Sequence, residues 1–345
     1  MHTLEKNGEE EIDDVLKYLG LLPSTSSTPI RSITYEQLEK TEWPEDIFIE
    51  GGILSRGDTM LIGADSKAGK STFICGMIRQ IISGGDFLGF KVTRPLKVLY
   101  MQAELRERRL KERLFPTYSK INPEFKQNIF VWSTRGIVLF GKDQSFIEAE
   151  IALCQPDILV IDPMLNFHHY NENDSQEMGE FFRYLDNIKE KYDIAIIMAH
   201  HFRKPSQEKG VKINLLDSIR GSSALRGWAV TTIAMEGRGE SEYRDLAFDL
   251  RNSDEPLKRT IRYNKDIKDF DWHDPITLIS QWAIEYLESR NGNPPTTEQF
   301  ISKMLDDNEV LGGNREKAFA IKKTLSNTKL IRSIEDGHKR LVSRF

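Results

Sequence analysis

The chain has 345 residues, of which 39% are hydrophobic and 29% are charged. This balance is typical of a globular protein, and at about 150 residues per domain the length predicts two domains, or one large domain with an appendage. No uninterrupted apolar run of about 18 residues occurs, which excludes a membrane-spanning helix, and the acidic N-terminus lacks the pattern of a signal peptide. We therefore expect a cytoplasmic protein. Its two cysteines, Cys75 and Cys154, lie in separate apolar stretches, so a disulfide framework is excluded.

Charge is distributed unevenly along the chain. The net charge is −5, but residues 314–345 hold nine Lys or Arg against three Asp or Glu, which leaves −11 for the remainder. We expect this basic C-terminal segment to bind polyanions.

The predicted elements divide the chain into three parts. Residues 1–45 are acidic and then rich in Ser, Thr and Pro, which predicts one short helix and a linker. In residues 46–268, short apolar runs alternate with longer helical segments, a pattern that predicts an α/β fold with a parallel sheet and crossover helices. Residues 275–345 predict a separate small domain.

Six apolar runs in the middle part predict strands that are covered on both faces. They lie at residues 59–63, 97–103, 128–133, 157–162, 194–200 and 229–235. Residues 244–252 and 258–264 then predict an antiparallel hairpin at the sheet edge, with Asp254, Glu255 and Pro256 in its turn.

A glycine-rich segment connects the first predicted strand to a helical run. Its pattern, A/G-x-x-x-x-G-K-S/T, is that of a Walker A loop, with alanine at the first position. Small residues allow backbone N–H groups to surround a phosphate, and the dipole of the following helix favours its negative charge. We expect Lys70 to reach the β- and γ-phosphates of ATP and the Ser71 hydroxyl to ligate Mg²⁺. The expected nucleotide contacts are Gly63, Ala64, Asp65, Ser66, Lys67, Ala68, Gly69, Lys70, Ser71 and Thr72. The alternative is a glycine-rich turn with a chance match.

Two carboxylates follow other predicted strands. Asp162 ends the buried run at 157–162, the Walker B position that holds the magnesium ion through its bound water. Glu104 follows the run at 97–103, and because parallel strands end at one edge of a sheet, we interpret it as the catalytic base for hydrolysis. The alternatives are an aspartate that caps the next helix and a solvated glutamate at the start of a helix with i,i+4 charge pairs.

The order of these motifs, continued by DILVIDPMLNFHHYNENDS, IIMAHHFRKP and IRGSSALRGWA, resembles the RepA-like hexameric replicative helicases of the RecA-fold P-loop ATPases, the AAA_25 type. The resemblance covers about residues 45–265. It implies a RecA-like core, a ring-shaped homo-oligomer, a hexamer, and ATP at the subunit interfaces. It also implies that His200 senses the γ-phosphate and that Arg220 is supplied across the interface to stabilise the transition state, with Arg226 as a rival for that role.

Two pairs of adjacent histidines, at 168–169 and 200–201, invite a zinc interpretation. Zinc sites usually need three or four ligands in a fixed geometry, and neither cysteine is nearby in sequence, so we do not expect one. We expect the polar segments 168–176 and 203–218 to form loops beside the ATP site. In a ring, the second loop would follow the phosphates of single-stranded DNA in the central channel, or else it is a surface loop with no partner. Its cations are Arg203, Lys204, Lys209 and Lys212.

The C-terminal part predicts three helices, at 276–290, 296–307 and 314–328, and a hairpin that turns at Asp336 and Gly337. This order suggests a winged helix-turn-helix domain whose third helix is the recognition helix, and its positive charge fits phosphate contacts. The alternative is a helical domain that packs within the ring or binds protein. The expected DNA contacts are Arg315, Lys317, Lys322, Lys323, Lys339 and Arg340.

The sequence therefore predicts a ring-forming, Mg²⁺-dependent ATPase that binds DNA and couples hydrolysis to translocation or unwinding, in plasmid, phage or mobile-element replication. One alternative is a nucleotide-dependent DNA-binding regulator or scaffold without helicase activity. A second is a small-molecule P-loop kinase, which would be a monomer with a lid and no affinity for DNA.

Overall fold

A computed structural model describes most of the chain beyond the N-terminal segment. The described residues are 32, 34–41, 46–65, 67–133, 136–139, 141, 143–172, 174–201, 216, 223–237, 240–251, 257–272, 275–290, 293–327, 331–336 and 338–343. The chain divides into two compact units. Unit 1 consists of Met1–Glu236, Leu246–Lys258 and Lys265–Asp269, and unit 2 consists of Gly237–Asp245, Arg259–Asn264 and Phe270–Phe345. None of the described helices is both long enough and apolar enough to cross a membrane.

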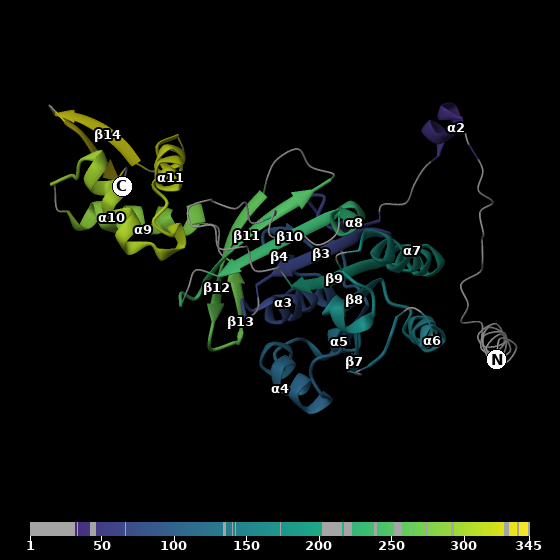
Figure 1. Ribbon diagram of the computed structural model, residues 1–345. Coiled ribbons are helices and arrows are strands. Elements are labelled where there is room, and N and C mark those ends of the chain that lie inside the picture. The colour runs from purple at the N-terminus through teal and green to yellow at the C-terminus, as the bar shows by residue number, and fades with distance from the viewer. Residues whose placement is uncertain are drawn as a thin grey trace, which may run out of the picture. The chain divides into compact units, whose positions relative to one another are not determined.

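A nine-stranded sheet with the order β13-β12-β11-β10-β3-β9-β8-β6-β7 forms the centre of the fold (Figure 1). All six predicted strands are present and pair in parallel, which confirms the predicted α/β fold. They are β3 (Thr59–Ala64), β6 (Val98–Gln102), β7 (Ile129–Ser133), β8 (Ile158–Asp162), β9 (Ala195–His201) and β10 (Thr231–Gly237). The strands β3, β6 and β8 are buried along their whole length, because helices cover both faces, and this burial explains their continuous apolar runs.

The strands β11 (Tyr243–Leu250) and β12 (Leu257–Asn264) form the predicted hairpin. The Tyr263 N–H donates to the Glu242 carbonyl over 2.8 Å, and the Thr260 hydroxyl donates to the Asp245 carboxylate over 2.8 Å. The paired residue number rises from 242 to 245 at β11 while it falls from 263 to 260 on β12, so the two strands are antiparallel. The predicted turn, residues 254–256, lies outside the described residues. The predicted place of the hairpin at the sheet edge is wrong, because an unpredicted strand, β13 (Asp269–Trp272), pairs with β12 and forms that edge.

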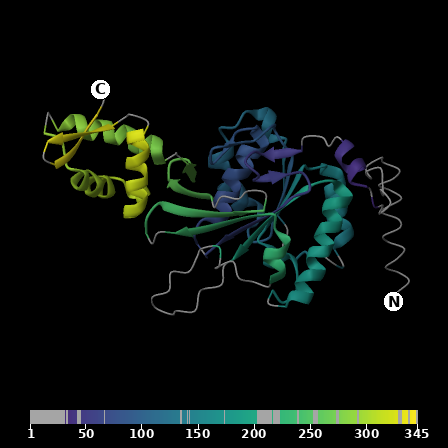
Figure 2. The same cartoon turned by 90° about the horizontal axis from the view of Figure 1, so that it is seen from above.

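Helices lie on both faces of the sheet (Figure 2). On one face α3 (Lys70–Ser83) contacts α4 (Glu107–Tyr118), which is followed by α5 (Pro123–Lys126). On the other face lie α6 (Gln144–Cys154), α7 (Ser175–Tyr192) and α8 (Ser223–Trp228). The core of this second face packs Phe181 and Leu185 of α7 against side chains from β3, β6, β8 and β9. We call the two sides the α3 face and the α7 face.

Strand alternation assigns the polar strand ends to these two faces. Leu99 and Met101 of β6, Leu159 and Ile161 of β8, and Ile196 and Met198 of β9 all belong to the core of the α7 face. Successive strand residues point to opposite faces. The α3 face therefore carries Tyr100, Gln102, Asp162 and His201, whereas the α7 face carries His200.

Several short elements complete unit 1. The strand pairs β1 (Ile47–Ile49) with β2 (Leu54–Ser55), and β4 (Asp86–Phe87) with β5 (Phe90–Lys91), are antiparallel, and η1 (Met164–Phe167) is a 3-10 helix. Near the N-terminus α2 (Tyr35–Lys40) begins at a capping box in which Thr34 and Gln37 bond reciprocally. The rest of the predicted N-terminal segment, residues 1–31, 33 and 42–45, lies outside the described residues.

Unit 2 contains the three predicted C-terminal helices and the predicted hairpin. The elements are α9 (Pro275–Ser289), α10 (Thr297–Asp307), the 3-10 helix η3 (Glu309–Leu311), α11 (Arg315–Asn327), β14 (Ile331–Asp336) and β15 (His338–Ser343). Ile279 of α9, Phe300 of α10 and Leu325 of α11 are completely buried together, so this unit has a hydrophobic core of its own. The threonine at position 296 caps α10 in a capping box with Gln299, as its sequence suggests.

Candidate active site

The predicted Walker A segment forms a tight loop between β3 and α3. Gly69 precedes the helix with φ +100°, a backbone conformation that other residues adopt only with strain, so glycine is required there. The Ala68 N–H donates to the Asp65 carbonyl over 3.2 Å, and the Phe73 N–H donates to the Gly69 carbonyl over 2.9 Å. The first N–H groups of α3 are therefore presented at the end of the parallel strands, an arrangement that suits an anion. Ser66 lies outside the described residues.

Lys70 is the first residue of α3, and its side chain is buried within the protein. It is 5% exposed, and its Nζ atom has no hydrogen-bond partner. Burial lowers the pKa of this lysine, while the charges of Asp162, Glu104 and Glu172 act in the opposite direction. A buried ammonium without a hydrogen-bond partner is costly to a protein. The site is therefore suited to a ligand that brings negatively charged oxygens, such as a triphosphate.

Asp162 ends β8 on the α3 face and is 1% exposed. Its Oδ2 atom accepts a hydrogen bond of 2.8 Å from the Tyr100 hydroxyl, whereas its Oδ1 atom is buried without a hydrogen-bond partner. No group of three or more His, Cys, Asp or Glu among the described residues could hold a metal ion by itself. A single carboxylate and the hydroxyl of Ser71 fit Mg²⁺, which usually takes few protein ligands and keeps water and phosphate oxygens.

Glu104 lies in the turn after β6, and its side chain is 43% exposed. Two neighbours fix this turn: the Gln102 side-chain oxygen accepts from the Leu105 N–H over 2.8 Å, and the Ser133 hydroxyl donates to the Leu105 carbonyl. Because its charge acts on Lys70, Glu104 shares the site with Lys70 and Asp162. The structure thus brings together the three charged residues that the sequence predicted for nucleotide hydrolysis.

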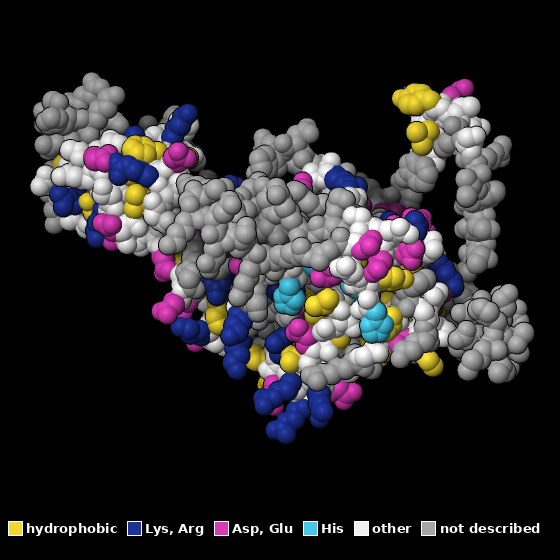
Figure 3. All heavy atoms as spheres, in the orientation of Figure 1, with side chains coloured by type: hydrophobic (Ala, Val, Ile, Leu, Met, Phe, Trp, Pro, Cys, Tyr) yellow, Lys and Arg dark blue, Asp and Glu magenta, His cyan; other side chains and the backbone are white. Residues whose placement is uncertain are grey.

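The helix that follows Glu104 has the predicted solvated character. Arg108 and Arg109 of α4 pair with Glu112 at 3.3 Å and 2.8 Å, and both arginine side chains are more than half exposed. Lys and Arg side chains gather over this helix on the molecular surface (Figure 3).

The two histidines at the end of β9 contact different carboxylates. His200 is 6% exposed, and its Nδ1 atom lies 3.5 Å from Oε1 of Glu172. The Nε2 atom of His201 lies 3.9 Å from Oε1 of Glu104, and burial lowers the pKa of His201. Glu172 was missed in the sequence because it lies within a polar segment predicted as a loop. Its position four residues after His168 is the only sequence signal that could have indicated it.

His168 is a core residue rather than an exposed ligand. Its side chain has no solvent exposure, its ring centroid lies 4.8 Å from that of Phe181, and its Nε2 atom lies 4.0 Å from Oε1 of Glu172. Burial lowers the pKa of His168 to about 4, so the ring is neutral at pH 7. The neighbouring His169 is exposed.

Several predicted residues lie outside the described part of the chain. These are Arg203, Lys204, Lys209, Lys212 and Arg220. Arg226 lies in α8, and Lys339 and Arg340 lie in β15, but their side chains are not described.

The predicted DNA contacts of unit 2 that are described lie on α11. Arg315 forms an ion pair with Glu298, and its guanidinium lies 5.7 Å from the ring centroid of Phe319. The Lys317 ammonium donates to the Thr260 hydroxyl over 3.3 Å, which holds it inside unit 2. Lys322 is half-buried and Lys323 is exposed.

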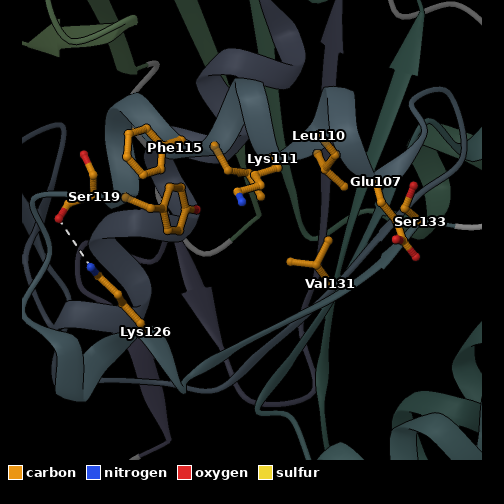
Figure 4. A pocket seen from close by; sticks show the side chains of 10 residues that line it. Glu107, Leu110, Lys111, Phe115, Ser119, Lys126, Val131 and Ser133 are labelled. Atoms are coloured by element: carbon orange, nitrogen blue, oxygen red, sulfur yellow. Dashed lines mark hydrogen bonds between the residues drawn. The ribbon is translucent and has the colours of Figure 1, made fainter.

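Two cavities lie away from the candidate active site. An apolar groove of about 420 Å³ in unit 1 lies between α4 and the edge strand β7, where Leu110, Phe115 and Val131 line it (Figure 4). A cavity of about 530 Å³ in unit 2 is lined by Tyr243, Arg262 and Asp307 among others. None of the predicted nucleotide or catalytic residues lines either cavity.

Comparisons with known proteins identify the family and the fold of this chain. The family model AAA_25, described as an AAA domain, matches residues 27–207, more than half of the chain. No curated protein sequence matches. One solved structure, an isolated ATPase domain, is similar with a TM-score of 0.52 and 15% identity, over 70% of this chain and 96% of that chain. A DnaB-like replicative helicase has the same TM-score and identity over 70% of this chain, but the match spans only 65% of that helicase. At this identity the two structures show a shared fold alone, an α/β core with a mostly parallel central sheet. The chain belongs to the AAA_25 family of AAA domains.

Proposed function

We propose that the protein is a Mg²⁺-dependent, ring-forming ATPase that binds DNA and couples ATP hydrolysis to translocation or unwinding. One observation carries the ATPase proposal: a buried lysine ammonium at the start of α3 and a buried carboxylate oxygen at the end of β8 both have no hydrogen-bond partner. Such groups are costly unless a ligand binds them. A nucleoside triphosphate with its magnesium ion supplies both charges.

Each site residue has its own proposed role in ATP hydrolysis. Lys70 and the first N–H groups of α3 would bind the β- and γ-phosphates, and Ser71 and Asp162 would hold Mg²⁺ directly and through water. The ion, when bound, neutralises charge that develops on the phosphate oxygens. Glu104 would accept a proton from the attacking water or orient it. His200 is proposed as the sensor of the γ-phosphate, and His201 lies beside Glu104.

The proposed ring places the ATP at an interface between subunits. Arg220 or Arg226 of a neighbouring copy would then stabilise the charge of the transition state, a contribution of about 10³-fold or more in rate in related NTPases. The segment 203–218 would contact single-stranded DNA in the channel, and its cations Arg203, Lys204, Lys209 and Lys212 would bind phosphates. We place this activity in plasmid, phage or mobile-element replication.

Unit 2 is proposed as a winged helix-turn-helix domain that binds duplex DNA. Three helices and a hairpin around one core support this proposal, as does the positive surplus of residues 314–345. The same features favour a second candidate function, a nucleotide-dependent DNA-binding regulator or scaffold without helicase activity. In that case unit 2 would read DNA and ATP would control assembly.

Three measurements test these proposals together. ATP hydrolysis with and without DNA is measured for the wild type, for Lys70→Ala and for Lys120→Ala, an exposed lysine outside the site. We expect hydrolysis to be lost only in Lys70→Ala, and unchanged hydrolysis in that variant would refute the ATPase proposal.

Strand displacement on a forked DNA substrate distinguishes a helicase from a regulator, which would bind the DNA without displacing a strand. Mass measurement with ATP and single-stranded DNA tests the ring, which a strictly monomeric protein would contradict.

A further inference from the structure

A buried tyrosine touches the proposed magnesium carboxylate. The Tyr100 hydroxyl donates a hydrogen bond of 2.8 Å to Oδ2 of Asp162, and neither side chain is more than 1% exposed. A phenol hydroxyl can donate and a carboxylate oxygen can only accept, so the tyrosine is the donor of this bond.

Strand pairing explains why this tyrosine reaches that carboxylate. In the parallel pair β6 and β8, Gln102 lies opposite Asp162, and Tyr100 lies two residues earlier on β6. Residues two apart on a strand share a face, so both Tyr100 and Asp162 lie on the α3 face. The long phenol side chain spans the diagonal distance between neighbouring strands, which is within reach of aromatic residues.

The hydrogen bond distinguishes the two oxygens of the carboxylate. Oδ2 is occupied by the tyrosine, whereas Oδ1 is buried without a hydrogen-bond partner, and the charge of Asp162 is the largest opposing influence on Lys70. If the tyrosine hydroxyl were absent, the carboxylate could turn about its last torsion, which is broad and two-fold. Outer hydrogen bonds of this kind orient metal ligands in proteins.

We propose that Tyr100 is a positioning residue that fixes Asp162 so that Oδ1 is presented to Mg²⁺ and its bound water. This inference rests on the proposed ATPase function. The tyrosine contacts neither the nucleotide nor the ion, and its effect is transmitted only through the carboxylate. Its loss should therefore weaken the use of Mg²⁺ and leave metal-free nucleotide binding unchanged.

The chain offers a matched control for this test. Tyr118 of α4 is also deeply buried, and its hydroxyl also donates a hydrogen bond of 2.8 Å, but to the backbone carbonyl of Cys75. Tyr118→Phe therefore removes an equivalent buried hydroxyl without touching Asp162. Any general effect of losing such a hydrogen bond on folding appears in both variants.

The experiment compares the wild type, Tyr100→Phe and Tyr118→Phe at a series of Mg²⁺ concentrations. The readouts are the ATP hydrolysis rate, the affinity for a fluorescent ATP analogue in Mg²⁺, and the same affinity in EDTA. For Tyr100→Phe we expect the Mg²⁺ concentration at half-maximal rate to rise about threefold to tenfold, the factor that corresponds to the net contribution of one hydrogen bond. The gain in affinity on adding Mg²⁺ should shrink by a similar factor, while the affinity in EDTA stays at the wild-type value.

Each outcome decides between the alternatives. If Tyr100→Phe keeps the wild-type Mg²⁺ dependence, or changes it no more than Tyr118→Phe does, the positioning role is wrong. If the wild type itself neither binds nor hydrolyses ATP, the proposed function fails, and the inference fails with it. If Tyr100→Phe does not fold, 3-fluorotyrosine replaces either Tyr100 or Tyr118 instead. A shift in Mg²⁺ dependence only at 100 supports the role, and equal values at both positions overturn it.

Discussion

The Nδ1 atom of His200, which lies on the α7 face of the sheet, is 3.5 Å from Oε1 of Glu172, whereas Asp162 lies on the α3 face. The next residue, His201, contacts Glu104 on the α3 face. Two adjacent histidines at one strand end are thus coupled to two different carboxylates. We infer that His200 acts in concert with Glu172, which lies in the segment that leads from η1 into α7.

A double-mutant cycle tests this coupling. We expect Glu172→Gln and His200→Gln to lower the rate of ATP hydrolysis by similar factors, and the double variant to lose little more than either one. Residues in one network typically show interaction energies of about 0.5–3 kcal/mol. The control cycle pairs Glu172→Gln with His201→Gln, whose losses should add. Additive losses in the first cycle would contradict a shared role.

An ion pair joins α3 to β13, with a buried aspartate and a half-buried arginine. Asp269 accepts hydrogen bonds from Nε and Nη2 of Arg79 at 3.3 Å and 3.2 Å, and a Cβ atom added to Gly76 would clash with the same carboxylate. We expect Gly76→Ala to displace Asp269 and to lower the free energy of unfolding by about 3 kcal/mol, as the loss of a buried ion pair does. Urea denaturation measures this change.

A second helical glycine provides the control for that substitution. Gly179 lies within α7, and an added Cβ would meet nothing within 4 Å. Gly179→Ala should raise the free energy of unfolding by about 0.5–1 kcal/mol, the helix preference of alanine over glycine. If both variants were stabilised alike, the packing of Gly76 against Asp269 would be refuted.

Neutral burial of His168 makes stability depend on pH. Its pKa is about 4 in the folded protein and about 6.5 in an unfolded chain. Between these values the unfolded chain binds more protons than the folded protein, so stability falls as the pH drops from about 6.5 towards 4. The effect amounts to about 2 kcal/mol at pH 5, with Glu172 and the exposed His169 as its charged neighbours.

Replacing the histidine should remove part of this dependence. We expect His168→Phe, which keeps an aromatic ring beside Phe181, to lose less stability between pH 7 and pH 5 than the wild type does. His169→Gln is the control, since that exposed ring should titrate alike in the folded and unfolded chains. Unfolding curves at pH 7 and pH 5 measure this loss of stability. If His168→Phe loses as much stability between the two pH values as the wild type, another group causes the pH dependence.

The sequence predicted the parallel strands and the carboxylates at their ends, because buried strands have a strong apolar pattern and the Walker A spacing is specific. It did not predict β13, whose DFDW segment alternates acidic and aromatic residues. The buried Asp269 of that strand is stabilised by Arg79, 190 residues earlier in the chain. Strand alternation places His200 and His201 on opposite faces of the sheet, but the sequence could not say which of them shares the face that α3 covers.

The exposed side of α11 is the proposed DNA-binding surface of unit 2. Arg315, Phe319, Lys322 and Lys323 follow the i, i+4, i+7 and i+8 spacing of one helix face, and Phe319 is 41% exposed. We expect the double variant Lys322→Ala with Lys323→Ala to weaken duplex binding and to reduce the salt slope of log K by about 2. Lys120→Ala should leave both unchanged. An unaltered slope in the double variant would exclude this helix from the DNA contacts.

Lys70 should destabilise the protein when no nucleotide is bound, and it should be essential for nucleotide binding. Its ammonium is buried without a hydrogen-bond partner, so Lys70→Met, of similar length, should raise the free energy of unfolding by about 1 kcal/mol or more. Thermal unfolding without nucleotide measures this gain. A lower free energy of unfolding in Lys70→Met than in the wild type would show that the lysine stabilises the fold itself, which contradicts a role in ligand binding alone.

Binding of a fluorescent ATP analogue to the wild type and to Lys70→Met, in the presence of Mg²⁺, tests the central claim most directly. Loss of a charged contact to phosphate predicts an affinity at least about 10-fold weaker for a variant that is no less stable than the wild type. Equal affinities in the two proteins would show that the loop between β3 and α3 does not hold the triphosphate.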